Sequence, residues 1–392
     1  MPRVNPAMLV WARETAGLTL DQAASRLAIN KAYGKPGPQR LAEIESSGEP
    51  TRPQLLAMMK VYRRPLLIFY MPQPPIASDR GEDFRSFPGP RPPEMEGRLD
   101  ALLRDVRTRH LVVKDVVADD DDAAPVTFVR SVKQIYGAPA VLKVLRGLLP
   151  IPLAELRREK TPDAVFARLR QAIEALGVFV LLVGDLGNYH TTIDTSVFRG
   201  YAIADEIAPF IVINDKDSKT AWSFTLLHEM AHLIIGASGI SGGTLPGSPV
   251  EQMCNQVASS FLLGEDELPE VAQQLRDQVV GVAVSLLIRF ADERKVSPDM
   301  VAYRLFRSDR ITEADWAEIR NALRDRLAAI RKARPEQGKS GGGDFYVVRR
   351  HRLGGLVGFA RRALAQGALT PTKAALVLGV KPRMVHTLVG YD

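Results

Sequence analysis

Two histidines four residues apart, set in an otherwise apolar segment, constrain this chain more than any other feature. His228 and His232 frame the motif His-Glu-Met-Ala-His. Residues four apart share one face of a helix, so both imidazoles can reach the same ion. Glu229, beside them, can act as a base toward a water held by that ion. The motif therefore predicts a helix that carries two zinc ligands and ends near Gly236. The alternative is a buried helix with two hydrogen-bonded histidines.

A third ligand is expected on a second helix. A catalytic zinc site uses three protein ligands and keeps one position open. Glu251 begins a helical pattern over residues 250–263 and shares a face with Cys254, Asn255 and Ala258. A carboxylate on such a buriable face needs a partner, which a metal would supply, although Glu251 could instead be an exposed acid favoured by the helix dipole. Other candidates for this ligand are His190, Asp185, Asp194, Asp215 and Cys254, the last of which is better explained as a small buried side chain.

Several stretches resemble the ImmA/IrrE family of metallopeptidases. They are residues 198–205, 211–214, 224–229 and 251–258, within a similar region of about residues 162–264. The resemblance implies a small zincin-like core, in which a short sheet packs on two ligand helices. It implies that His228, His232 and Glu251 bind Zn²⁺ and that Glu229 is the general base. It also implies that the protein substrate is a transcriptional repressor, cut under stress or in mobile elements.

Residues that assist the reaction can be suggested only from their side-chain type and their closeness in the sequence to the motif. Tyr189, His190 and Tyr201 precede the motif and could support an oxyanion, and each also has an ordinary structural explanation. Asn255, on the face of the presumed third ligand, could orient a ligand. The resemblance supplies no residue that stabilises the transition state, because no position here matches such a motif.

The N-terminal region has the pattern of several short helices over residues 6–70. Residues 20–27 are similar to the second helix of XRE-type helix-turn-helix domains, and residues 63–70 resemble the end of such a domain in front of this peptidase. Residues 34–38 depart from that pattern, since their two glycines and two prolines break a helix. The recognition helix would therefore begin only near Pro38.

Four residues around this departure are candidates for DNA binding. Gln39 and Arg40 would lead the late recognition helix, where side chains meet base edges. Lys31 and Lys35, in the inserted loop, could contact phosphates. The loop could also block docking, and the domain would then bind protein or position the peptidase.

Basic charge is concentrated at both ends of the 392-residue chain. Residues 1–72 carry ten Lys/Arg against five Asp/Glu, and residues 331–392 carry twelve against three. Three short helices are predicted over 356–366, 371–378 and 382–389, with Gly379 between the last two as in a helix-turn-helix. Such ends suggest DNA or an acidic partner, although solubility alone, or a C-terminal oligomerisation lid, would also explain them.

Length and composition suit several soluble domains of an α+β protein. The predicted domains are 1–72, helix-turn-helix; 73–161, helical connector; 162–333, zincin-like peptidase with a helical tail; and 334–392, Gly-rich linker and basic helical module. The core would thus be flanked by mostly α-helical N- and C-terminal domains. A single cysteine, with no basic-then-apolar leader, fits the cytoplasm, and the longest apolar run, 279–288, is too short for a bilayer.

Taken together, the residues favour a zinc-dependent endopeptidase with no membrane partner, and the resemblance implies that it cuts a regulatory protein. The alternative is a non-catalytic, DNA- or protein-binding transcriptional regulator or antitoxin that uses a peptidase-like core as a sensor. A purely structural zinc site would prefer four ligands rich in cysteine, and the chain has one cysteine.

Overall fold

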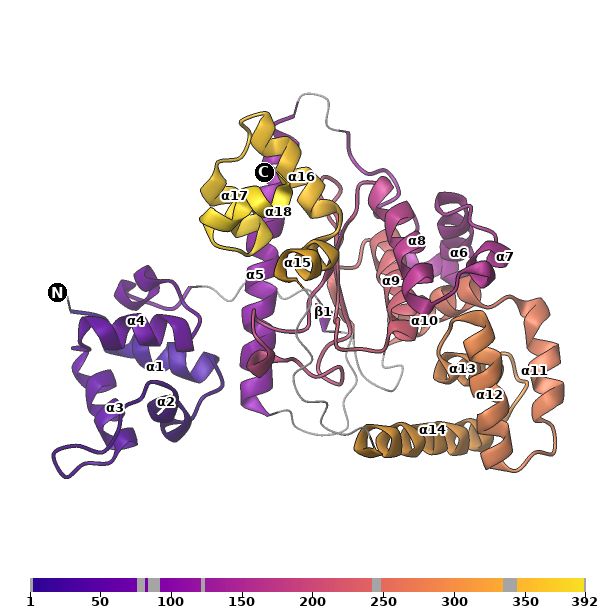
Figure 1. Cartoon of the computed structure of the whole chain (residues 1–392), viewed down its shortest axis with the longest axis horizontal. Coiled ribbons are helices and arrows are strands. Elements are labelled where there is room, and N and C mark those ends of the chain that lie inside the picture. Colours follow the sequence, from indigo (N-terminus) through magenta and orange to yellow (C-terminus); the bar gives the residue numbers. More distant parts are fainter. Residues whose placement is uncertain are drawn as a thin grey trace. The chain divides into compact units, whose positions relative to one another are not determined.

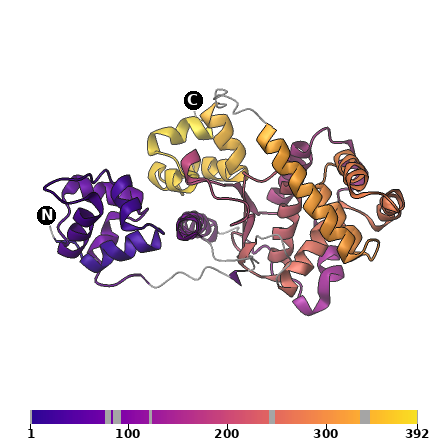
Figure 2. The same ribbon diagram turned by 90° about the horizontal axis from the view of Figure 1, so that it is seen from below.

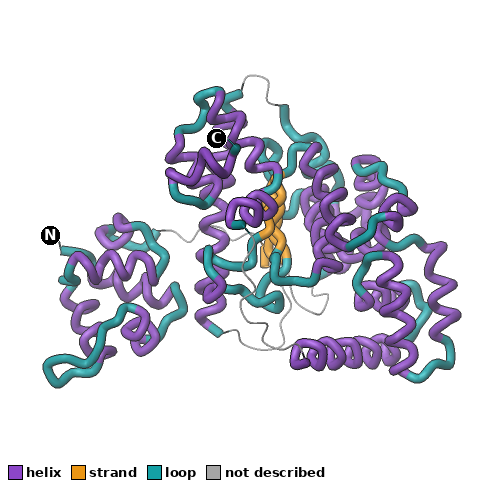
Figure 3. The backbone as a smooth tube through the Cα atoms, viewed as in Figure 1, coloured by secondary structure: helices purple, strands orange, loops and turns teal. Residues whose placement is uncertain are grey.

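The computed structural model describes residues 3–75, 82–83, 92–120, 124–241, 248–333 and 344–390 (Figure 1). Its contacts divide the chain into two compact units. The first unit comprises residues 1–80, 87–107 and 185–197, and the second comprises residues 81–86, 108–184 and 198–392. Helices dominate both, and the described strands form one small sheet in the second unit, consistent with an α+β class (Figure 3). The four domain boundaries drawn from the sequence stay predictions.

Short helices form most of the first unit. They are α1 (Pro6–Thr15), α2 (Leu20–Arg26), α3 (Gly37–Ser47), α4 (Arg52–Val61) and the 3-10 helix η1 (Leu66–Tyr70). Asn5, Thr19 and Thr51 begin three of them, because each side chain accepts a hydrogen bond from a backbone N–H of the first turn. The apolar faces meet in one core that includes Leu9 and Leu41. The series of short helices predicted for this region is confirmed.

The segment between α2 and α3 makes a tight turn. Ala32 and Lys35 form an antiparallel bridge, and the two residues between them, Tyr33 and Gly34, both have left-handed backbones, with φ of 54° and 77°. This combination is the one that closes a two-residue hairpin. The following helix begins at Gly37, one residue before its predicted start. A side chain at Gly37 would lie 2.1 Å from the carbonyl oxygen of Ile29, so this position requires glycine.

Two of the four DNA-binding candidates interact with their own domain. Lys35 Nζ lies 2.6 Å from Glu43 Oε1, and a guanidinium nitrogen of Arg40 donates to a main-chain carbonyl before the turn at 2.7 Å. Lys31 and Gln39 are exposed. Of the cations predicted to bind DNA here, Lys35 and Arg40 already interact within the domain.

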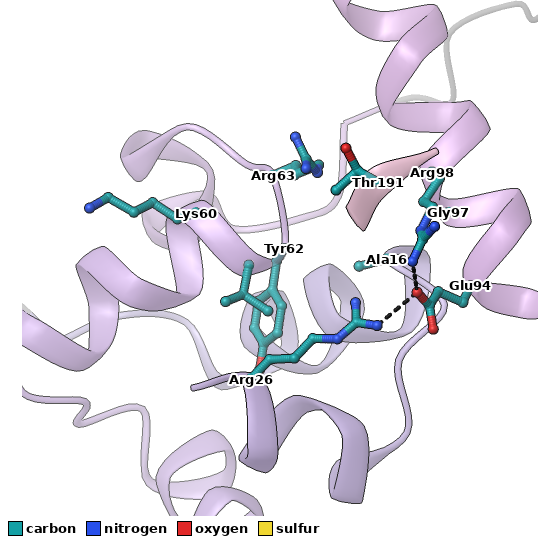
Figure 4. A pocket seen from close by; sticks show the side chains of 10 residues that line it. Ala16, Arg26, Lys60, Tyr62, Arg63, Glu94, Gly97, Arg98 and Thr191 are labelled. Atoms are coloured by element: carbon teal, nitrogen blue, oxygen red, sulfur yellow. Dashed lines mark hydrogen bonds and ion pairs between the residues drawn. The ribbon is translucent and has the colours of Figure 1, made fainter. Parts of the chain in front are cut away.

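One carboxylate, that of Glu94, pairs with two arginines at the wall of a cavity in the first unit (Figure 4). Helix α5 (Pro93–Ala118) contributes its first half to this unit. Glu94 Oε1 accepts hydrogen bonds from Arg26, at 2.7 Å, and from Arg98. A Cβ at Gly97 would lie 2.4 Å from the main chain of Ala16, so α5 approaches α1 closely at this point. The lining residues are Ala16, Arg26, Lys60, Val61, Tyr62, Arg63, Glu94, Gly97, Arg98 and Thr191. Arg26 of α2 and Arg98 of α5 therefore both bind Glu94, and these ion pairs join the two helices.

The second unit contains a mixed sheet of short strands. They are β1 (Glu82–Asp83), β2 (Phe179–Leu182), β3 (Gly200–Ile203), β4 (Phe210–Ile213) and β5 (Gly239–Ser241), in the order β1-β5-β3-β4-β2. Strands β2 and β4 run parallel, while β3 is antiparallel to both β4 and β5. Runs such as Phe-Val-Leu-Leu and Phe-Ile-Val-Ile are nearly continuous apolar segments, as expected of strands covered on both faces.

Helices cover one face of this sheet and position the histidine motif. Helix α8 (Pro162–Ala175) packs against α9 (Lys219–Ile235), and α9 contacts β3 and β4. Val180, Ala202 and Ile211 lie in the core cluster that these helices share with the sheet. Helix α10 (Pro249–Leu262) packs on α9, and α6 (Gly137–Leu148) contacts both. The two predicted ligand helices are therefore adjacent.

Other helices cover the opposite face (Figure 2). His110, in the second half of α5, makes an edge contact with Phe210 of β4, with ring centroids 5.4 Å apart. Phe359 makes the same kind of contact with Phe179 of β2 at 5.4 Å. Phe359 belongs to α16 (Gly355–Ala365), which follows α15 (Phe345–Leu353) and precedes α17 (Pro371–Leu378) and α18 (Val385–Val389). The C-terminal helices thus belong to the shell around the sheet.

The remaining helices are spread along the chain, and α13, one of those that follow α10, packs on it. They are η2 (Gln134–Tyr136), α7 (Leu153–Arg158), η3 (Tyr189–Thr191, in the first unit), η4 (Glu265–Glu267), α11 (Leu268–Leu275), α12 (Val280–Arg294), α13 (Pro298–Arg307), α14 (Glu313–Ala333) and η5 (Pro382–Met384). Helix α13 contacts α10, while α12 and α14 pack on α13. The predicted helical tail after residue 263 is confirmed. Among the described residues, no helix combines the length and the apolar character needed to cross a membrane.

Candidate metal centre

Helix α9 carries the histidine motif in the middle of the second unit. It ends at Gly236, whose backbone is left-handed with φ of 75°, as the sequence predicts. His228 and His232 lie one turn apart on this helix and are 4% and 1% exposed. Their Nε2 atoms are 3.1 Å apart. The helical spacing therefore directs both rings toward one point in the interior.

Helix α10 brings Glu251 to the same point. Ser248 caps the helix by accepting a hydrogen bond from the N–H of Glu251, which fixes this residue in the first turn. Glu251 Oε1 lies 3.0 Å from Nε2 of His232, and its Oε2 lies 3.4 Å from Nε2 of His228. Burial raises the pKa of Glu251, but the two histidines outweigh this effect and lower it to about 2. The carboxylate is thus charged at neutral pH.

The spacing of these three groups fits a zinc ion. Donor atoms about 2.0–2.1 Å from a tetrahedral zinc lie ~3.3 Å from one another. The measured separations of 3.0, 3.1 and 3.4 Å are close to that value, and the donor atoms all lie within 4.8 Å of one another. Two imidazoles and one carboxylate form a donor set found in catalytic zinc sites. The residues present could therefore hold the ion.

Glu229 is enclosed beside this cluster. It is 0% exposed, and neither carboxylate oxygen makes a hydrogen bond of ordinary geometry within the described residues. Burial raises the pKa of Glu229 to about 8, against the opposing effect of His228. A Cβ placed on Gly200 of β3 would lie 2.0 Å from Glu229 Oε1 and 2.9 Å from a methyl group of Thr225. The space for this carboxylate therefore exists because residue 200 has no side chain.

Two polar side chains complete the surroundings. Ser241, the last residue of β5, is 4% exposed and places its Oγ 3.2 Å from Nε2 of His228 and 3.4 Å from Nε2 of His232. Nothing in the local sequence marks Ser241, because only the β3–β5 pairing brings it to α9. Burial lowers the pKa of His228, but Glu251, Glu229 and a hydrogen bond with Asn255 outweigh this effect and raise it. Asn255, one turn after Glu251, is thus a predicted residue that the structure brings to the cluster.

Of the remaining candidates, the structure separates Tyr201 from the cluster. Gly200 faces Glu229, so the alternation of β3 directs Tyr201 to the opposite face of the sheet, where it is buried. The structure thus does not bring Tyr201 to the cluster. Tyr189 and His190 lie in η3 of the first unit, and their support of an oxyanion stays a prediction. Cys254 is fully buried in the core.

The comparison with protein families identifies the segment that contains the cluster. A family model named Peptidase_M78, described as the IrrE N-terminal-like domain, matches residues 183–306. This segment includes strands β3 to β5 and the helices that carry His228, His232 and Glu251. The match supports the resemblance to the ImmA/IrrE family and a metallopeptidase-like function. Neither the curated proteins nor the solved structures contain a match to this chain.

Proposed function

We propose that the chain is a zinc-dependent endopeptidase that cleaves a regulatory protein. The observation that carries this proposal is the convergence of His228, His232 and Glu251, from two helices, beside the enclosed carboxylate of Glu229. The match of this segment to a metallopeptidase family supports the same conclusion. A purely structural ion-pair cluster would explain the two histidines and Glu251. It would not require Glu229, a second buried acid, beside them.

His228, His232 and Glu251 would hold the zinc ion. Bound zinc would act as a Lewis acid on a peptide carbonyl and lower the pKa of a water toward ~7. The two imidazoles contribute no charge when neutral, so Glu251 alone would offset part of the ion's charge. Asn255 would help to orient His228, and Ser241, whose Oγ faces the two Nε2 atoms, would lie next to the ion itself.

Glu229 would move the proton. As the buried base next to the ligand pair, it would take a proton from the attacking water and pass it to the leaving amine. Burial raises the pKa of Glu229 to about 8, and the positive charge of a bound zinc ion would lower it, so that the carboxylate would be charged and ready to accept a proton. Gly200 gives this side chain its room.

The substrate and setting that we propose follow from the resemblance. A transcriptional repressor is the proposed protein substrate, cut in the cytoplasm during a stress response or to control a mobile element. The proposed appendage is the XRE-type helix-turn-helix in the first unit. Its support is the order of α1 to α4 and the exposed Lys31 and Gln39.

Metal content and cleavage, measured together, test the proposal. Wild-type protein and Glu229→Gln would be assayed for zinc and incubated with candidate repressors encoded beside the gene. Zinc in both, with a cut only by wild type, is the expected result. Absence of zinc from both would contradict the assignment of His228, His232 and Glu251 as ligands.

A second function is favoured by the enclosure of the site. His228, Glu229, His232 and Glu251 are between 0% and 6% exposed, so a peptide has little access to them in this conformation. The chain would then be a non-catalytic DNA- or protein-binding regulator or antitoxin with a peptidase-like sensor core. Zinc in both proteins, with no cut by either against any candidate repressor, would favour this function.

A further inference from the structure

The C-terminal helices contain an unusual excess of positive charge. Residues 345–390 carry eight Lys/Arg and no Asp or Glu. A helical segment of this length is usually near neutral, because about a quarter of residues are charged with both signs represented. The catalytic cluster uses none of these eight cations.

Three of these eight side chains form hydrogen bonds or an ion pair with other parts of the protein. Arg349 donates to the carbonyl of Leu378 at 2.7 Å, and Arg350 donates to that of Leu388 at 2.8 Å. Arg352 forms an ion pair of 2.5 Å with Asp215, which follows β4. These contacts account for the cations of α15 structurally. The other five are exposed: Arg361, Arg362, Lys373, Lys381 and Arg383.

The exposed cations belong to a compact arrangement of three helices, α16 to α18 (Figure 1). Thr370 caps α17, and Gly379 ends it with a left-handed backbone of φ 61°. The chain then turns through Lys381 and η5 into α18, whose Val385, Leu388 and Val389 are buried. Two helices joined by a short turn containing glycine are the order of elements found in a helix-turn-helix.

This arrangement is held at a defined place in the second unit. Arg170 of α8 donates to the carbonyl of His351 at 2.5 Å, and Glu174 accepts from the N–H of Gly355 at 2.9 Å. Helices α15 and α16 contact β2, whereas α17 contacts mainly α16, η5 and α18. The anchored side is thus α15 with α16, and Arg349 of α15 also holds the end of α17 through the carbonyls of Leu378 and Gly379. Lys381 and Arg383, which follow, are exposed.

We propose that the surface formed by Lys373, Lys381 and Arg383 binds double-stranded DNA. In a helix-turn-helix, the start of the second helix enters the major groove, and the start of the first lies at the phosphate backbone. Lys381 and Arg383 occupy the former place, at η5, and Lys373 occupies the latter, in the first turn of α17. The complete absence of acids over residues 345–390 favours a polyanion over a protein of mixed charge.

Duplex binding by the full-length protein tests this surface. Anisotropy of a labelled 30-base-pair duplex would be measured at several salt concentrations for wild type and for the triple variant Lys373→Gln, Lys381→Gln, Arg383→Gln. We expect the variant to raise Kd about tenfold or more and to lower the slope of log K against log salt by about 2.7, or 0.9 per lost phosphate contact. A matched control removes three exposed cations of α6, α7 and the following loop: Lys143→Gln, Arg158→Gln, Lys160→Gln.

Three outcomes would overturn the proposal. The first is a wild-type protein that does not bind the duplex at low salt. The second is a triple variant that binds as wild type does, which would assign the affinity to the helices of the first unit. The third is equal or tighter binding of polyglutamate, which would indicate an acidic polypeptide as the partner. Thermal melting should be unchanged in both variants, because the six positions are exposed.

Discussion

At the scale of single residues, the metal centre depends on a glycine as much as on its charged groups. Gly200 precedes the apolar part of β3, and a sequence motif for zinc sites would not include it. Its hydrogen atom faces the Glu229 carboxylate at a distance that excludes any side chain. The Glu229 carboxylate can therefore occupy its position only while residue 200 of β3 lacks a side chain. Adding a single methyl group at residue 200 tests this requirement.

Gly200→Ala should displace the Glu229 carboxylate and reduce cleavage, while zinc binding is retained. The added methyl group overpacks a buried site, which costs about 1–3 kcal/mol of unfolding free energy. Urea unfolding, zinc content and cleavage of the identified substrate would measure these effects. Gly281→Ala is the control, since Gly281 lies in α12 with nothing within 4 Å of the added atom. Wild-type activity in Gly200→Ala would contradict the role given to this glycine.

At the scale of elements, buried arginines join segments that are distant in the sequence. Arg170 of α8 donates to Glu174 on its own helix, to the carbonyl of Val180 in β2 and to the carbonyls of His351 and Arg352 at the end of α15. Only the planar, five-donor guanidinium can serve so many acceptors at once. The C-terminal helices therefore attach to the core through this side chain.

Arg170→Lys should lower the free energy of unfolding by about 2 kcal/mol, because lysine cannot satisfy the separate carbonyls that Arg170 now reaches. Chemical denaturation of the full-length protein would measure the change. Arg168→Lys, two residues earlier on the same helix, is the matched control. Its side chain is 42% exposed and pairs with surface carboxylates, so we expect little effect. Equal losses in the two variants would argue against the anchoring role.

A second junction makes stability depend on pH. Burial raises the pKa of Glu267, but hydrogen bonds from Arg157, from the N–H of Gly264 and from Arg294 outweigh it and hold the pKa below its usual value. A carboxyl whose pKa is lower in the folded state stabilises the fold above its unfolded pKa, near ~4.3. That stabilisation is lost as the pH falls through the folded pKa.

Glu267→Gln should therefore destabilise the protein by about 2 kcal/mol at pH 7, and the difference from wild type should shrink as the pH falls below ~4. Urea unfolding at a series of pH values would follow this difference. Glu270→Gln is the control, because Glu270 is 59% exposed and pairs with Arg294 at 3.4 Å. A difference between wild type and Glu267→Gln that is independent of pH would contradict the ion-pair explanation.

At the scale of the whole molecule, the C-terminal helices are integrated into the second unit. Phe359 packs on Phe179 of β2, and α15 contacts the same strand. The shell of the sheet thus includes a segment that the sequence separates from the peptidase core by a Gly-rich stretch. A chain without this segment would expose the apolar side of β2.

Deletion of residues 344–392 should lower the unfolding free energy of the second unit by about 3 kcal/mol or more, as expected from uncovering a buried aromatic contact. Differential scanning calorimetry and the binding of an apolar dye would measure the loss and the exposed surface. Phe345→Ala is a control for the apolar side chains of the segment, since Phe345 is 50% exposed. An unchanged melting profile after deletion would show that residues 344–392 form an independent domain.

Local features of this protein can be predicted from its amino-acid order alone. Helical spacing placed His228 and His232 on one face, and Gly236 marked the end of their helix, because both depend on residues within a few positions. The helix of Glu251 and the short helices of residues 6–70 follow from the same local rules. A resemblance in a few stretches was enough to associate the segment with a metallopeptidase family.

Contacts between residues that are distant in the chain become visible only in the folded structure. The place of Ser241 depends on the pairing of β3 with β5, and the exclusion of Tyr201 depends on which way β3 faces. The charge of a side chain also does not predict that it will bond within the protein, as Arg349, Arg350 and Arg352 do. The physical reason is that strand pairing and helix packing join residues far apart in the chain, and local propensity does not encode those contacts.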